Sequence, residues 1–209
     1  MLCLLAVGCE SALRWSPEYY VVQPGDTLYS IAFGYRIDQR DLAAWNNLGS
    51  GSLIRTGQRL KMTGSAMDHR QATAKSSSVA STQAKPVATW QWPTDGAVIS
   101  GYGASSKTQS GIQIGGRRGQ TVRAAAPGEI VYSGSGLPGY GQLLIIKHNA
   151  NYLSAYGHND SLEVNEGDQV EMGQRIARMG NGPGRRPLLH FEIRRNGKPV
   201  NPVKYLPSR

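Results

Sequence analysis

Residues 139–160 read GYGQLLIIKHNANYLSAYGHND, and this stretch decides the fold of the second half of the chain. Two apolar runs flank Asn149-Ala150-Asn151, which predicts a β-hairpin with strands over residues 142–147 and 152–158. Side chains two residues apart share one face of a strand. The second strand is therefore expected to present on one face Tyr152, Ser154, Tyr156 and His158.

Short strands are expected on both sides of this hairpin. Glycine accounts for 26 of the 209 residues, and turns such as Pro127-Gly128 separate the apolar segments. The expected strands cover residues 98–100, 112–114, 121–124, 129–132, 174–179 and 188–194. Short strands at such even spacing predict a mainly antiparallel, β-sandwich-like domain.

A smaller unit with helices precedes it, so the fold class as a whole is α+β. A strand is expected over residues 20–22 and another over 57–62, with two helices between them. Asp26, after the turn Pro24-Gly25, is expected to cap the first helix, and Asp38 the second. The first helix presents at helical spacing Leu28, Ile31, Ala32 and Tyr35.

Composition separates the two units. Ser, Thr and Ala fill 15 of the 27 positions of residues 63–89, too little apolar surface to order a segment, so these residues are expected to form a disordered linker. Residues 20–62 and 90–209 are the expected domains, and the second carries 14 basic against 8 acidic residues. A basic surface suits an anionic polymer such as a cell wall, and no basic-aromatic stripe indicates nucleic acid. The chain has no apolar run long enough for a transmembrane helix.

The first nine residues end in Leu4-Leu5-Ala6-Val7-Gly8-Cys9 and resemble a bacterial lipoprotein signal. The resemblance implies a lipid anchor on Cys9, with residues 1–9 as the signal segment, and Glu10 implies the outer membrane. An ordinary buried N-terminal segment is the alternative interpretation.

The first domain resembles the LysM module through YVVQPGDTLYSIA, LAAWNNL and IRTGQRLKM, which occur in that order from residue 20 to residue 62. LysM modules bind glycans that contain N-acetylglucosamine, such as peptidoglycan strands. The resemblance implies glycan contacts by Gly25, Asp26, Thr27, Leu28, Leu53, Ile54 and Arg55. Taken singly, Asp26 is equally well explained as a helix cap and Leu28 as a core residue.

The chemistry of the second domain depends on whether it holds a metal. A hydrolytic zinc site needs about three protein ligands and one open position for water. Of the four histidines, His69 lies in the linker and His148 at the hairpin turn, which leaves His158 and His190. Glu192 shares a strand face with His190 and is a possible third ligand.

From about Trp92 to Pro207 the chain resembles LytM (lysostaphin-type) zinc peptidases, which have the duplicated hybrid motif fold. The resemblance rests on residues 139–160, on GQRIARMG at 173–180 and on LHFEIRRNGKPVNPVKYLP at 189–207. It implies that Gln109 and Gln113 stand where active members have a histidine and an aspartate ligand. It also implies that Leu188 replaces a catalytic histidine, whereas the third ligand (His190) and a further catalytic histidine (His158) are kept.

These replacements predict a protein without a metal, a cofactor or peptidase activity, because amides are poor zinc ligands and leucine transfers no protons. Within the family the domain resembles the NlpD-type murein hydrolase activators. That resemblance implies an outer-membrane lipoprotein on the periplasmic side that binds peptidoglycan and activates an N-acetylmuramoyl-L-alanine amidase during daughter-cell separation. The expected amidase contact is the altered groove with its rim, formed by Gln109, Gln113, His158, Leu188, His190, Tyr102, Tyr140, Arg185 and Arg186. A zinc endopeptidase and a structural wall tether are the alternatives.

Overall fold

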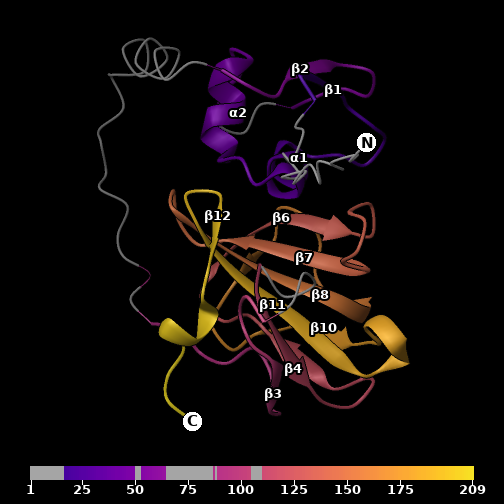
Figure 1. Ribbon diagram of the computed structural model, residues 1–209, viewed down its shortest axis with the longest axis vertical. Helices are drawn as coiled ribbons and strands as arrows, with labels where there is room; N and C mark the ends of the chain where they lie inside the picture. Colours follow the sequence, from indigo (N-terminus) through magenta and orange to yellow (C-terminus); the bar gives the residue numbers. More distant parts are fainter. Residues whose placement is uncertain (1–16, 50–52, 65–86, 88, 105–109) are drawn as a thin grey trace, which may run out of the picture.

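A computed structural model of the chain describes residues 17–49, 53–64, 87, 89–104 and 110–209. Cys9, Gln109 and most of the expected linker lie outside these residues. We call residues 17–64 the N-terminal module and residues 89–209 the C-terminal domain; Figure 1 shows the module seated on one side of the domain. In the described part of the chain, no helix is long and apolar enough to cross a bilayer.

The N-terminal module has the expected β-α-α-β order. Its elements are β1 (Tyr19–Val21), α1 (Leu28–Tyr35), α2 (Gln39–Trp45) and β2 (Arg59–Lys61). The two strands pair antiparallel, with Tyr20 opposite Leu60. One apolar core joins the helices to this ribbon, and its buried members are Val22, Leu28, Ile31, Ala32, Leu42, Ala43, Leu60 and Met62.

The cap of α1 corrects the sequence analysis. The N-cap is Thr27, whose hydroxyl accepts from the backbone N–H of Ser30, while the Ser30 hydroxyl accepts from the Thr27 N–H. Asp26 lies one residue too early, and its carboxylate instead accepts from the Gln23 N–H and the Tyr20 hydroxyl. Asp38 does cap α2, as predicted.

The C-terminal domain is a strongly curved, wholly antiparallel sheet that wraps around its own core (Figure 1). Its strands are β3 (Val98–Ser100), β4 (Ile112–Gly115), β5 (Thr121–Arg123), β6 (Gly128–Gly134), β7 (Gln142–Lys147), β8 (Tyr152–Leu162), β9 (Gln169–Val170), β10 (Arg175–Met179), β11 (Leu188–Arg195) and β12 (Lys198–Val200). The main path runs β3-β4-β11-β8-β7-β6-β9, while β10 pairs with β5 and with the far half of β8. Two short 3₁₀ helices complete it, η1 (Pro183–Arg185) and η2 (Pro202–Lys204).

The predicted hairpin is confirmed as β7 and β8, and both of its faces are buried. Leu144 and Ile146 face inward into the domain core together with Tyr156, whereas Leu143 and Ile145 face outward. These four consecutive residues in the middle of β7 are each 0% exposed. An uninterrupted apolar run is typical of a strand that is covered on both sides.

The N-terminal module supplies the outer cover. Phe33, near the end of α1, packs on the outward residues; we call this set the junction cluster, and its buried members are Phe33, Val131, Tyr132, Leu143, Ile145 and Ala155. Phe33 is 2% exposed, and its ring is 5.4 Å from the ring of Tyr140. The two modules therefore share a small apolar interface.

The turn between β11 and β12 brings the backbones of the two modules into close approach. Gly197 has φ +72° in the Asn196-Gly197 turn, and a β-carbon there would lie 2.6 Å from the backbone nitrogen of Asp38. Glycine is needed at this position both for the positive φ and for the space.

Candidate functional site

The site is built on β11, whose sequence LLHFEIRR alternates between two faces. Leu189, Phe191 and Ile193 point into the domain core. His190, Glu192 and Arg194 therefore lie on the opposite, outward face, where each is at most 4% exposed. Three buried polar side chains on one strand face need partners, because an unpaired buried charge is costly.

Glu192 is the centre of the resulting network. Arg194 Nε lies 2.9 Å from its Oε2, and the Tyr140 hydroxyl donates to its Oε1 over 2.9 Å. His190 Nε2 lies 2.9 Å from the same Oε1. Burial acts to raise the pKa of Glu192, but Arg194 and His190 outweigh it and hold that pKa below its usual value. Burial and the neighbouring Glu192 raise the pKa of Tyr140, which therefore remains a neutral donor.

Arg194 also ties this network to the N-terminal module. Its Nη1 donates to the backbone carbonyl of Phe33 over 2.6 Å, and its guanidinium carbon lies 3.3 Å from the centroid of the Phe33 ring. Stacking on an aromatic face satisfies a desolvated guanidinium that is only 1% exposed.

His158 faces this network, and its placement corrects the sequence analysis. Alternation along β8 would put it on the inward face with Tyr156, but it has φ +63° and lies at an irregularity in the β7–β8 pairing. The extra residue turns the imidazole outward, 6.2 Å from the ring of His190. Burial, and secondarily His190, lower the pKa of His158 to about 4, so the ring is neutral at physiological pH.

These side chains surround a cavity of about 320 Å³, which we call the groove cavity. Gln113 on β4 lies opposite His190 in the β4–β11 register and forms part of the cavity wall. The full lining is Arg36, Ser110, Gln113, Pro138, Gly139, Tyr140, His158, Pro183, His190 and Glu192.

The N-terminal module contributes Arg36 to this wall, a residue that the sequence analysis missed. Arg36 ends α1 in the left-handed conformation, and its Nη2 donates to the Ser110 hydroxyl over 2.7 Å. Arg194 was missed as well, although the His-x-Glu-x-Arg alternation on one predicted strand was a usable signal for a buried ion pair.

The other predicted groove residues lie at varying distances from the cavity. Arg185 and Arg186 are exposed at η1, and Pro183 is the residue of that turn that lines the cavity. Leu188 is buried beneath Gly182 and does not line it. Tyr102 also lies outside the lining, and its hydroxyl donates to the Pro199 carbonyl.

The described donor set does not fit a zinc ion. The groove cavity brings together His158, His190 and the amide of Gln113, and the carboxylate of Glu192 is already engaged by three donors. A zinc centre needs about three anionic or imidazole ligands with one open position. Among the described residues no group of three histidine, cysteine or acidic side chains is placed to hold a metal. These side chains can instead form hydrogen bonds with a molecule that fits the cavity.

Most of the predicted glycan-contact residues lie together in the structure. Asp26, Thr27, Leu28, Leu53 and Ile54 line a second cavity of about 280 Å³, which we call the module pocket. Its opposite wall comes from the C-terminal domain and includes Glu129 and Glu166. Gly25 and Arg55 are exposed and lie outside its lining.

Comparisons with known proteins agree with this two-part architecture. The model of the LysM domain matches residues 20–63, and that of peptidase family M23 matches residues 107–202. A protein of Pseudomonas aeruginosa named lipoprotein NlpD/LppB homolog is 41% identical over 91% of this chain and 77% of its own length.

Two further matches cover the C-terminal domain. The murein hydrolase activator NlpD of Escherichia coli is 53% identical over 59% of this chain, which is 33% of that activator's length. Among solved structures, a zinc-containing peptidase from Vibrio cholerae matches with a TM-score of 0.51 and 28% identity, over 57% of this chain and 41% of that one.

Proposed function

The chain belongs to the NlpD/LppB lipoprotein family, and from this membership together with the groove cavity we propose that it is a non-catalytic activator of a cell-wall amidase. It binds peptidoglycan strands through the N-terminal module and an N-acetylmuramoyl-L-alanine amidase through the groove of the C-terminal domain. Septal wall splitting and daughter-cell separation are the result.

The observation that carries this proposal is the state of Glu192. In the groove cavity, the carboxylate of Glu192 is neutralised by Arg194 and hydrogen-bonded by Tyr140 and His190. A carboxylate held in this way is a weak general base. These groups favour recognition of a partner's polar side chain over hydrolysis.

Activation requires no chemistry from the activator. A protein that binds the open form of an amidase more tightly than its closed form shifts the equilibrium towards the open form. A shift from about 1% to about 99% open needs about 10⁴-fold tighter binding of the open form. The groove cavity and the η1 turn beside it, with Arg185 and Arg186, form the proposed contact.

The same proposal places the protein in the envelope. Relatives of this family are named lipoproteins, which supports lipidation of Cys9. The finer assignment, to the periplasmic face of the outer membrane, follows from Glu10 after that cysteine. The proposed domain organisation remains a signal segment over 1–9, LysM over 20–62, a linker over 63–89 and the degenerate peptidase domain over 90–209.

The test combines zinc analysis with dye release from labelled peptidoglycan, with and without a purified amidase. We expect no stoichiometric zinc, no release by the protein alone, and stimulated release when the amidase is present. Zinc together with release by the protein alone would instead establish an endopeptidase. Glycan binding without stimulation of any amidase from the same organism would establish a tether.

A charge reversal tests where the amidase binds. The double variant Arg185→Glu/Arg186→Glu is expected to reduce stimulation at least tenfold, because reversed rim charges slow association and weaken the complex. The matched control is Lys198→Glu/Lys204→Glu, which makes the same charge change at two exposed residues outside the groove cavity. Equal stimulation by the two double variants would refute this contact surface.

A further inference from the structure

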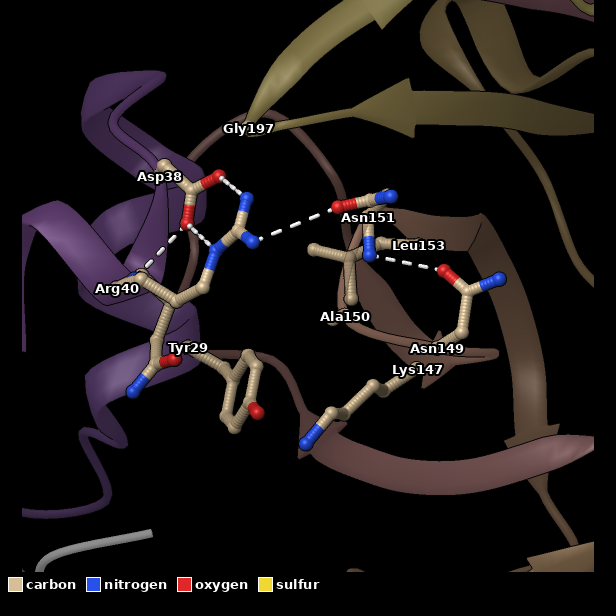
Figure 2. Close-up of a pocket in the computed structure, with 10 residues that line it drawn as sticks. Tyr29, Asp38, Arg40, Lys147, Asn149, Ala150, Asn151, Leu153 and Gly197 are labelled. Atoms are coloured by element: carbon tan, nitrogen blue, oxygen red, sulfur yellow. Dashed lines mark hydrogen bonds and ion pairs between the residues drawn. The ribbon is translucent and has the colours of Figure 1, made fainter. Parts of the chain in front are cut away.

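A third cavity lies between the two modules, away from the groove cavity. It has a volume of about 390 Å³, and we call it the junction pocket. Tyr29 and Arg40 of the N-terminal module line one side of it, and Lys147 and Asn151 of the C-terminal domain line the other (Figure 2). Its volume falls in the usual range for small-ligand sites, about 300–1,000 Å³.

The junction pocket adjoins the module pocket. Tyr29 and Gln39 line both of them, so the two pockets share a wall. A linear polymer with one unit in the module pocket can therefore place a neighbouring unit in the junction pocket. The C-terminal domain supplies the far side of each.

Gln39 marks this shared wall as a ligand contact. Its side chain is 8% exposed, and its Nε2 has no hydrogen-bond partner among the described residues. An unpaired buried donor costs about 1–3 kcal/mol, so such groups are unusual unless something binds to them. The amide N–H group suits an acceptor such as the carbonyl oxygen of an N-acetyl group.

The charges of the two pockets differ. In the junction pocket, Arg40 is paired with both carboxylate oxygens of Asp38, at 3.0 and 2.7 Å, so these two charges cancel. Lys147 is the other cation of this pocket, and it forms no ion pair with a described carboxylate, although Glu129 lies opposite it in the β6–β7 register. Its ammonium lies 5.5 Å from the centroid of the Tyr29 ring. Figure 2 labels both side chains at the pocket.

The module pocket has the opposite polarity, because Glu129 and Glu166 line it. A carboxylate on the ligand is repelled there and attracted by Lys147. An aromatic wall beside a cation and amide groups suits an acidic N-acetylated sugar, whose apolar ring face packs on Tyr29. The polarity thus orders two units along a strand, the neutral one in the module pocket and the anionic one in the junction pocket.

We propose that the two modules together form a composite glycan site, in which the junction pocket binds the free lactyl carboxylate of an N-acetylmuramic acid unit in a peptidoglycan strand whose stem peptide has been removed. The neighbouring N-acetylglucosamine occupies the module pocket. This inference rests on the proposed glycan binding by the N-terminal module and extends it: the C-terminal domain distinguishes peptide-free peptidoglycan strands, the product of an amidase, from neutral N-acetylglucosamine polymers.

Calorimetry on the full chain at low salt tests this with two probes. One is chitotetraose, which is neutral; the other is the peptide-free tetrasaccharide of alternating N-acetylglucosamine and N-acetylmuramic acid with free carboxylates. We expect the wild-type protein to bind the acidic probe about ten- to a hundredfold more tightly, the size of one hydrogen bond to a charged group. Lys147→Gln is expected to abolish this preference, because it removes the charge that the carboxylate of the acidic probe contacts.

Two further variants control the result. Lys204→Gln removes an exposed charge outside both pockets and is expected to change neither affinity. Gln39→Leu is expected to weaken the binding of both probes about tenfold without lowering the unfolding temperature, because the N–H donor that is lost has no partner in the free protein. An unchanged preference in Lys147→Gln would overturn the composite site alone. Failure of the wild-type protein to bind either probe would overturn the proposed glycan binding as well.

Discussion

The two faces of the β7–β8 hairpin are equally buried but are covered in different ways. On the inner face, Leu144, Ile146 and Tyr156 join a continuous core built from most strands of the same domain. On the outer face, Leu143, Ile145 and Ala155 are covered by Phe33 of the N-terminal module.

The outer cover is also more polar. Around Phe33, the module is held by Arg194 on a backbone carbonyl, by Arg36 on Ser110 and by Arg40 on Asn151 and Asn196. Interfaces between domains of one chain are typically small and more polar than domain cores. The comparison teaches that two side chains with equal exposed fractions need not stabilise the protein equally. How much a buried side chain contributes depends on which residues cover it.

The largest expected effect belongs to the inner face. Phe191→Ala removes a ring that is 0% exposed and lies 5.3 Å from the ring of Tyr156. We expect the free energy of unfolding of the C-terminal domain to fall by about 3–5 kcal/mol, because the core cannot close over the cavity. Denaturant titration followed by circular dichroism measures it. A smaller loss than for Phe33→Ala would contradict the ranking of the two faces.

On the outer face, Phe33→Ala is expected to undock the modules without unfolding the domain. The free energy of unfolding of the C-terminal domain should change by only about 1 kcal/mol, a typical value for a single substitution, because its own core is intact. Small-angle X-ray scattering should show a longer molecule than the wild type. The control is Val21→Ala, which truncates a residue of the same module that is 46% exposed, and should leave the scattering unchanged. An unchanged shape in Phe33→Ala would show that the polar contacts alone hold the modules together.

A third comparison concerns acid, and it sets two histidines with lowered pKa values, His148 and His158, against each other. Burial lowers the pKa of His148 to about 4, and its Nδ1 and Nε2 lie 2.7 Å from the Pro127 carbonyl and the Ser154 hydroxyl. Since the unfolded chain binds this proton with a pKa of about 6.5, its contribution to stability is complete above that pH. The contribution is lost as the pH falls towards 4, by at most about 1.4 kcal/mol per pH unit.

Unfolding titrations at pH 7, 5.5 and 4.5 measure this slope in the wild-type protein, in His148→Gln and in His158→Gln. We expect His148→Gln to flatten the profile more, because His158 faces the open groove cavity, where solvent screens its charge. An equal flattening by the two variants would show that the groove around His158 is as dry as the surroundings of His148.

Local sequence patterns predicted the elements well where short-range chemistry decides them. The hairpin of β7 and β8 follows from two apolar runs and an Asn-rich turn, and the start of α2 follows from Asp38. Where two local solutions compete, the sequence was insufficient. Thr27 rather than Asp26 caps α1, because Ser30 completes a reciprocal pair of hydrogen bonds with it.

The candidate site, too, could be predicted from the sequence only in part. His158, His190 and Gln113 were identified from the chain alone, and they do line one cavity. The outward turn of His158 depends on a bulge that only the pairing with β7 reveals. Arg36 reaches the cavity from a module that lies more than seventy residues earlier in the chain, as its bond to Ser110 shows.

The sequence by itself determined the two modules, their order and the residue types of the groove, because periodicity, turns and caps act over a few neighbouring residues. Only the tertiary structure decided which partner covers the outer face of the hairpin, and that Arg194 neutralises Glu192 beneath Phe33. An uninterrupted apolar run indicates that a strand is buried on both sides. It does not identify the element that covers each side, because burial of apolar surface is non-directional. The junction between the modules, with its pocket beside Lys147, exists only once both have folded.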